Sequence, residues 1–122
     1  MIKGVGVDLI DIGRIANAIE KNHRFLERVF NDREREWYME KGSRPETAAG
    51  IFAAKEAVSK VLGTGIGKIS WQEIAIEPDD MGKPVVLLMG KANQMAQEKA
   101  ISSIHVSISH ERKLAIAFAV GQ

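Results

Sequence analysis

Three sets of polar residues in this 122-residue sequence have types and spacings that could do chemistry. Asp8 lies in a glycine-flanked segment, Glu56 and Lys60 are four residues apart, and one short alternating run contains His105, Ser107, Ser109 and His110. Two carboxylates in a chain without cysteine suit a hard cation such as Mg²⁺, which keeps waters and binds substrate phosphates. A nearby lysine would add positive charge for those phosphates. These residues alone predict, as a hypothesis, Mg²⁺-assisted chemistry on a phosphate ester.

Each set also has a plainer explanation. Asp8 or Asp11 can cap the helix that follows, which is a common use of aspartate at a strand-to-helix junction. Glu56 and Lys60 can form an i,i+4 ion pair worth only about 0.3–0.5 kcal/mol. The last run can provide a hydrogen-bonded, partly buried histidine and small residues that only pack. Since the sequence contains no nucleophile elbow, zinc-ligand spacing or Walker loop, both explanations of each set stay open.

The longest predicted element is a helix over residues 43–62, which carries the second set. Ser43 with Glu46 three residues later is typical of a capping box, and Pro45 suits the first turn. A glycine-rich loop over residues 63–67 ends the helix and would offer accessible backbone amides to phosphates. The expected core stripe contains Ile51, Ala54, Val58, Val61 and Leu62, and the opposite face carries Phe52, Glu56, Ser59 and Lys60.

The N-terminal segment alternates as a strand over residues 3–10. Its two predicted faces consist of Val5, Val7 and Leu9 on one side and Gly4, Gly6 and Asp8 on the other. The glycines remove side-chain bulk beside Asp8, so another group can approach the backbone there.

Two helical regions follow before the central helix. The region over residues 12–30 is expected to break near Asn22 and to turn Ile15, Ile19, Leu26 and Phe30 toward the core. The region over residues 31–41 starts with Asn31 and Glu34 as a capping box, and its alternating charges are typical of an exposed helix.

The C-terminal half reads as strands with one more helix. Strands are predicted over residues 69–77, 85–89, 103–109 and 114–120, and a helix over residues 90–100. This order predicts an α+β fold in which a mainly antiparallel sheet packs on a long central helix, within a single domain spanning residues 1–122.

Composition limits the classes of function. The hydrophobic fraction of 45% and charged fraction of 27% are normal for a globular chain. A net charge of +1 argues against a protein that coats nucleic acid. The absence of cysteine, of a signal peptide and of a long apolar run predicts a cytoplasmic location with no membrane association.

A basic helical face near the N-terminus is the main candidate for a partner surface. Arg14, Lys21 and Arg28 recur on one side of the region over residues 12–30, with Phe25 in the same register. Such a face is usually only solvated, and Glu20 dilutes its charge. A basic face with an aromatic residue also suits an acidic partner protein. Nucleic acid is disfavoured because the chain has 6% aromatic residues and no dense basic run.

Three motifs together resemble the holo-acyl-carrier-protein synthase family of 4′-phosphopantetheinyl transferases, of the short bacterial type. The motifs are Gly4-Val-Gly-Val-Asp-Leu-Ile-Asp11, Phe52-Ala-Ala-Lys-Glu-Ala-Val-Ser-Lys60 with Leu-Gly-Thr-Gly-Ile-Gly67, and His105-Val-Ser-Ile-Ser-His110. The resemblance implies transfer of the 4′-phosphopantetheine arm of coenzyme A to a serine of apo-acyl carrier protein, with release of adenosine 3′,5′-bisphosphate, in support of fatty acid biosynthesis. It also implies the fold of that family and a homotrimer with an active site at each subunit interface.

The same resemblance implies roles for individual residues. Asp8 and Glu56 would hold Mg²⁺, and Lys60 would neutralise charge on the departing pyrophosphate. The proton acceptor would be either His110 or a water held by Glu56 or the metal. Contacts to coenzyme A would come from Lys60, Gly63, Thr64, Gly65, Lys83, Pro84, His105 and Ser107, the last four from a neighbouring subunit. The acidic carrier protein would dock on Arg14, Lys21, Arg24, Phe25 and Arg28.

The chain departs from the family pattern at Ile51, where relatives often carry a basic residue. Either a phosphate contact comes from elsewhere, for example from Arg44, or the affinity for coenzyme A is altered. Two other functions stay open from the sequence: a non-catalytic module that binds acidic proteins, and a Mg²⁺-dependent enzyme that acts on a different pyrophosphate ester.

Overall fold

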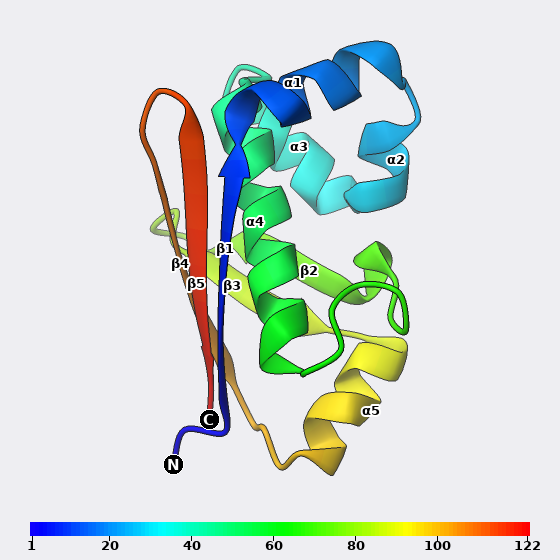
Figure 1. Cartoon of the computed structure of the whole chain (residues 1–122), viewed down its shortest axis with the longest axis vertical. Coiled ribbons are helices and arrows are strands. Elements are labelled where there is room, and N and C mark those ends of the chain that lie inside the picture. The colour runs from blue at the N-terminus through cyan, green and yellow to red at the C-terminus, as the bar shows by residue number, and fades with distance from the viewer.

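The computed structural model describes all residues from 1 to 122 and contains five helices and five strands. In chain order the elements are β1 (Gly4–Asp11), α1 (Ile12–Lys21), α2 (Phe25–Val29), α3 (Asp32–Glu40), α4 (Pro45–Val61), the single 3₁₀ turn η1 (Trp71–Glu73), β2 (Ile74–Pro78), β3 (Pro84–Leu88), α5 (Gly90–Glu98), β4 (Ile104–His110) and β5 (Leu114–Gly121). Figure 1 shows α4 in the middle of the molecule, with a sheet along one side of it and the other helices around it.

Two antiparallel sheets confirm the predicted fold class. The larger sheet has the strand order β1-β5-β4, and β2 and β3 form a separate hairpin. Helix α4 packs on one face of the three-stranded sheet, whereas no helix covers the other face (Figure 1). The α+β architecture built around α4 therefore follows the prediction.

Small residues let α4 lie unusually close to the sheet. A Cβ atom at Gly6 would lie 2.0 Å from the carbonyl oxygen of Ala57, and one at Gly4 would lie 2.8 Å from that of Val61. On β5 the buried residues beneath the helix are Ala115, Ala117 and Ala119. The group that approaches the backbone beside Asp8 is thus α4 itself.

The large residues of these strands face away from α4. The exposed apolar side chains are Val5, Val7 and Leu9 on β1 and Leu114, Ile116 and Phe118 on β5. They pair across the two strands, for example Val7 with Phe118 and Leu9 with Ile116. We name these six side chains the outer apolar face. Helix α4 packs against the glycine and alanine side of the sheet. The opposite side, which carries the large apolar residues, is therefore left exposed in a single chain.

The start of α4 differs from the prediction. The N-cap residue is Arg44, which makes no side-chain capping hydrogen bond, and Pro45 occupies the first turn. Ser43 lies outside the helix with a φ of +53°, so the predicted capping box at Ser43 and Glu46 is wrong. Gly63, with a φ of +83°, follows the helix end as expected.

Helix α4 is buried on more sides than an amphipathic pattern implies. Its apolar stripe is buried as predicted, but Ser59, assigned to the opposite face, is also fully buried and donates to the Glu56 carbonyl at 2.6 Å. Phe52 is partly buried and lies against Trp71, with ring centroids 4.8 Å apart.

The helices before α4 follow the predicted boundaries closely. Asp11 caps α1, and the helical region breaks at Asn22. The capping box of α3 is present, because Asn31 Oδ1 accepts from Glu34 N at 2.8 Å and Glu34 Oε1 accepts from Asn31 N at 2.9 Å. The charges of α3 form local ion pairs at its surface, as is typical of an exposed helix, except that Glu34 is fully buried.

The strand predicted over residues 69–77 forms only from Ile74, because the three residues before it adopt the turn η1. The other strand and helix predictions in the C-terminal half are confirmed to within two residues. None of the helices has the length and apolar character needed to cross a bilayer.

Candidate active site

Asp8, Glu56 and Lys60 lie together where β1 runs along α4. The amine of Lys60 donates to the Val7 carbonyl at 2.8 Å and lies 3.5 Å from Asp8 Oδ1. Lys60 forms no ion pair with Glu56, so the i,i+4 pair is absent. The helix cap predicted at Asp8 or Asp11 is confirmed at Asp11, so it does not account for Asp8.

The electrostatics of this cluster favour a bound cation. Burial raises the pKa of the Glu56 carboxyl, and the charge of Asp8 raises it further, whereas Lys60 lowers it. Two carboxylates that repel each other in a half-buried place are stabilised by a divalent ion. The structure contains no set of three or more potential metal ligands, so the chain offers only two carboxylates, which fits the sparse protein ligation of Mg²⁺.

Most of the amides in the loop after α4 already have hydrogen-bond partners. The N–H groups of Thr64 and Gly65 both donate to the Ser59 carbonyl at 3.3 Å, and that of Gly63 donates to Lys60 at 3.0 Å. The Thr64 hydroxyl donates to the Gly65 carbonyl at 2.9 Å. The expectation that the loop amides are available to phosphates is therefore wrong for Gly63, Thr64 and Gly65, whereas the N–H of Ile66 makes no hydrogen bond within the chain.

Four residues predicted to contact coenzyme A share one groove beside β4. This groove of about 410 Å³ is lined by Lys83, Pro84, His105 and Ser107, with Phe118 next to them. The expectation of a partly buried His105 is wrong, because its ring is exposed and its Nε2 lies 3.0 Å from Gln122 Nε2. The structure thus brings together residues that are more than 20 positions apart in the sequence.

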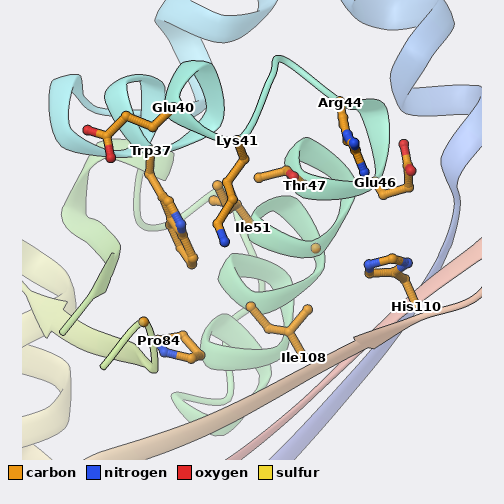
Figure 2. Close-up of a pocket in the computed structure, with 12 residues that line it drawn as sticks. Trp37, Glu40, Lys41, Arg44, Glu46, Thr47, Ile51, Pro84, Ile108 and His110 are labelled. Carbon is orange, nitrogen blue, oxygen red and sulfur yellow. The ribbon is translucent and has the colours of Figure 1, made fainter. Parts of the chain in front are cut away.

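His110 lines a second, larger cavity of about 620 Å³ between α3, α4 and the end of β4 (Figure 2). Lys41 and Arg44 supply its positive charges, and Glu40 and Glu46 supply its negative charges. Figure 2 shows the Lys41 amine pointing into the space, with His110 at its far side. Both lysine and arginine can hold a phosphate, so the cavity suits an anionic ligand with a flat apolar part.

The two cavities adjoin each other. Pro84 and Ile108 line both of them. Ile51 occupies the position at which relatives often carry a basic residue. It is 1% exposed and forms part of the apolar wall of the larger cavity. Arg44, named from the sequence as a substitute cation, lines the same cavity, so its position is compatible with that role.

The groove, the larger cavity and the carboxylate cluster do not form one site within a single chain. Asp8 lies on β1 and the two cavities lie at β4, and β5 separates these strands in the sheet. Neighbouring strands lie about 4.8 Å apart, so the cluster and the groove are about two strand spacings from each other. The outer apolar face lies between them, and its Phe118 also lines the groove.

The basic residues of α1 and α2 are exposed, as predicted for a partner surface. They are Arg14, Lys21, Arg24 and Arg28. Phe25 is different: it is buried and packs edge-on against Phe30, with ring centroids 6.4 Å apart. The prediction that its ring belongs to the exposed docking surface is wrong, because α2 is amphipathic and turns this position inward.

Sequence reasoning missed a buried ion pair between α3 and α4. Lys55 Nζ lies 2.6 Å from Glu34 Oε1, and both side chains have no exposure. Lys55 also donates to the carbonyls of Val29 and Trp71, and Glu34 Oε2 accepts from Ile76 N. A signal existed: Lys55 follows Ile51 by four residues and precedes Val58 by three, so it falls on the predicted core stripe of α4.

Residues 4–119 match the 4′-phosphopantetheinyl transferase superfamily, and the chain belongs to that superfamily. It is 49% identical to the holo-[acyl-carrier-protein] synthase of Alkaliphilus metalliredigens over 98% of each chain. The crystal structure of the synthase from Neisseria meningitidis superposes with a TM-score of 0.89 at 34% identity, covering 100% of this chain and 99% of that one.

A third relative was crystallised with a ligand. The Bacillus anthracis synthase in complex with CoA (3′,5′-ADP) is 40% identical, with a TM-score of 0.81 over 99% of this chain and 96% of that one. Within the superfamily, the chain groups with the holo-[acyl-carrier-protein] synthases, and it is an enzyme of that group.

Proposed function

We propose that this enzyme transfers the 4′-phosphopantetheine arm of coenzyme A to a serine of apo-acyl carrier protein and releases adenosine 3′,5′-bisphosphate. The observation that carries the proposal is the cluster of Asp8, Glu56 and Lys60 at the edge of β1, in a chain of the phosphopantetheinyl transferase superfamily. One catalytic domain over residues 1–122 performs the reaction. It serves fatty acid biosynthesis in the cytoplasm.

Asp8 and Glu56 hold Mg²⁺ in this proposal. When bound, the ion supplies positive charge to the pyrophosphate of coenzyme A. The support from the structure is the donor set, namely two hard oxygen ligands: burial raises the pKa of Glu56, and repulsion from Asp8 raises it further. Mg²⁺ dependence is tested directly by adding EDTA and then restoring the metal.

The chain's own groups perform the remaining steps. The serine oxygen of the carrier bonds to the β-phosphorus of coenzyme A, and the bond from that phosphorus to the oxygen bridging to the α-phosphate breaks. Lys60 neutralises charge on the departing bisphosphate, since its amine is half exposed and adjacent to Asp8. The serine proton goes to His110 or to a water that Glu56, alone or with a bound metal, would hold. The pH–rate profile of His110→Gln distinguishes these two acceptors.

Coenzyme A occupies the groove and the larger cavity. Lys83, Pro84, His105 and Ser107 contact it in the groove, and Arg44 with Lys41 contacts a phosphate in the cavity, in place of the basic residue absent at position 51. Gly63, Thr64 and Gly65 contribute the shape of the adjoining loop rather than free amides.

A homotrimer completes this site. The outer apolar face exposes Val5 by 56% and Phe118 by 48%, and a soluble monomer rarely leaves so many large apolar side chains in one patch. A neighbouring copy that covers the face would bring its own Asp8 cluster toward the groove that Phe118 borders. Phe118→Glu should therefore give monomers on size-exclusion chromatography and lose transferase activity. A trimeric, active Phe118→Glu variant would contradict this assembly.

The acidic carrier protein docks on the basic face formed by Arg14, Lys21, Arg24 and Arg28. Charge reversal at Arg14 and Arg28 should raise the KM for the carrier at low salt and leave the KM for coenzyme A unchanged. No change in the carrier KM would favour an enzyme that acts on a small pyrophosphate ester.

The deciding experiment is a mass measurement. Incubation with coenzyme A, Mg²⁺ and an apo-carrier protein should add about 340 Da to the carrier. Asp8→Ala and Glu56→Ala should abolish this shift while the fold persists by circular dichroism. Binding of the carrier without any mass shift would favour the non-catalytic module, and near-normal turnover of either variant would show that the metal ligands are assigned wrongly.

A further inference from the structure

The last turn of α2 has an unusual set of hydrogen-bond partners. A helix leaves its last four carbonyl groups without intrahelical donors, and a helix of five residues has little stability of its own. The carbonyls of residues 27–30 receive no backbone N–H group in this structure. Side chains from outside α2 donate to them instead, so contacts with other elements fix where this short helix lies.

Gln72, in η1, supplies most of these donors. Its Nε2 lies 3.0 Å from the carbonyl oxygen of Glu27, 3.3 Å from that of Arg28 and 3.0 Å from that of Phe30. Gln72 makes no other side-chain hydrogen bond. All hydrogen bonds of the Gln72 side chain are therefore made with the C-terminal end of α2.

Two charged side chains complete the arrangement. Arg35 of α3 donates to the Phe30 carbonyl at 2.6 Å, and Lys55 of α4 donates to the Val29 carbonyl at 2.7 Å. Both side chains also form ion pairs, Arg35 with Asp32 and Lys55 with buried Glu34. Only Gln72 is an exposed residue whose removal affects α2 without opening the core.

The position of α2 matters because it carries part of the basic face. Arg24, at its N-terminus, and Arg28 are exposed, whereas Phe25 and Val29 are buried and anchor the helix. The buried side chains hold one face of the helix on the core. The Gln72 amide adds an exposed contact at the last turn, since its Nε2 lies within hydrogen-bond distance of three carbonyls there.

We propose that Gln72 is a positioning residue for carrier docking: it fixes the orientation of α2 and thereby directs Arg24 and Arg28 toward the acidic partner. The inference rests on the proposed function, in which the basic face of α1 and α2 receives the carrier protein. Gln72 itself touches neither substrate.

The test is Gln72→Met, which keeps the length of the side chain and removes its donors. The KM for the carrier should rise about three- to tenfold, the loss typical of one or two hydrogen bonds, with kcat and the KM for coenzyme A unchanged. The matched control is Gln94→Met, which makes the same change at an exposed position of α5 and should leave all three constants unchanged.

A double-mutant cycle separates positioning from general weakening of the fold. In an Arg24→Ala/Arg28→Ala background, Gln72→Met should have no further effect on the carrier KM, because the side chains that it directs are gone. An equal effect in both backgrounds, or a fall in kcat, would assign Gln72 a structural role only and overturn the proposal.

The controls also separate this inference from the proposed function. If Arg24→Ala/Arg28→Ala alone raises the carrier KM but Gln72→Met does not, docking stands and positioning by Gln72 is refuted. If the arginine variant does not change the carrier KM while the mass shift of the carrier persists, docking on α2 is refuted together with this inference, and the transfer activity stands.

Discussion

Two lysines of α4, five residues apart, each lie beside an acidic side chain, but one pair is buried and the other is partly exposed. Lys55 lies 2.6 Å from Glu34 and both side chains are fully buried. Lys60 lies 3.5 Å from Asp8, and the two side chains keep 50% and 18% of their exposure. The first pair is part of the core, and the second lies at the proposed site.

Hydrogen bonding explains better than charge why the first pair is part of the core and the second is not. The three amine protons of Lys55 have three acceptors, and both oxygens of Glu34 accept from backbone N–H groups. A buried ion pair is stable only when its remaining donors and acceptors are satisfied in this way. Asp8 and Glu56 instead repel each other, and the partly exposed Lys60 pairs with Asp8 alone, which leaves the carboxylates able to bind a ligand.

Replacing Lys55 breaks the first pair and should have the largest effect on stability. Lys55→Met should lower the free energy of unfolding by about 3–5 kcal/mol, because Glu34 would stay buried without its cation. Denaturant unfolding at pH 7 measures the change. Lys60→Met is the matched control on the same helix and should change stability by less than about 0.5 kcal/mol. Similar losses in both variants would refute the distinction drawn between the two pairs.

Adding Glu34→Gln to Lys55→Met sharpens this result. The double variant removes both buried charges and should recover part of the lost stability, since the unpaired carboxylate accounts for much of the cost. No recovery would mean that the lost hydrogen bonds to Val29 and Trp71 dominate instead.

Replacing Lys60 should affect turnover rather than stability. In the proposed reaction its charge acts on the departing bisphosphate, so Lys60→Met should lower kcat by about 10²–10³-fold, the usual cost of removing one preorganised electrostatic contact. The initial rate of carrier modification at saturating coenzyme A and Mg²⁺ measures this loss. A rate within threefold of the unmodified enzyme would show that the charge is not needed for the reaction.

Local patterns predicted the elements well. The break at Asn22 and the capping box of α3 each depend on residues close together in the sequence. Of the polar residues singled out at first, all except Ser109 lie at the cluster, the groove or the adjoining cavity. Local chemistry was sufficient for these predictions.

Several of the predictions that failed depend on contacts between distant residues. Glu34 is buried because Lys55 and Ile76, 21 and 42 positions away, meet its carboxylate. Phe25 turns inward because it meets Phe30 and Phe52. The sheet reverses the usual rule that large apolar residues face the helix layer, because glycines and alanines let α4 approach closely. Neither periodicity nor composition contains this information.

Glu73 differs from both Glu34 and Glu56, because its carboxylate accepts hydrogen bonds from backbone N–H groups without being buried. Burial raises the pKa of both Glu34 and Glu56, whereas backbone hydrogen bonds from Ser70, Lys91 and Ala92 lower the pKa of Glu73. Its carboxylate thereby joins η1 to the first turn of α5, where a negative charge is favourable.

A lowered folded-state pKa means that the unfolded chain binds more protons than the folded chain near and below the ordinary value of 4.5. The stability that Glu73 contributes is therefore complete above that pH and is lost as the pH falls through the folded-state pKa. Glu73→Gln should cost at most about 1 kcal/mol at pH 7 and less at pH 3, because the contact is exposed and screened. Urea unfolding at both pH values measures the two differences, with Glu98→Gln, at a carboxylate without hydrogen bonds, as the control. An equal cost at both pH values would show that the charge of Glu73 is irrelevant and that only the shape of its side chain matters.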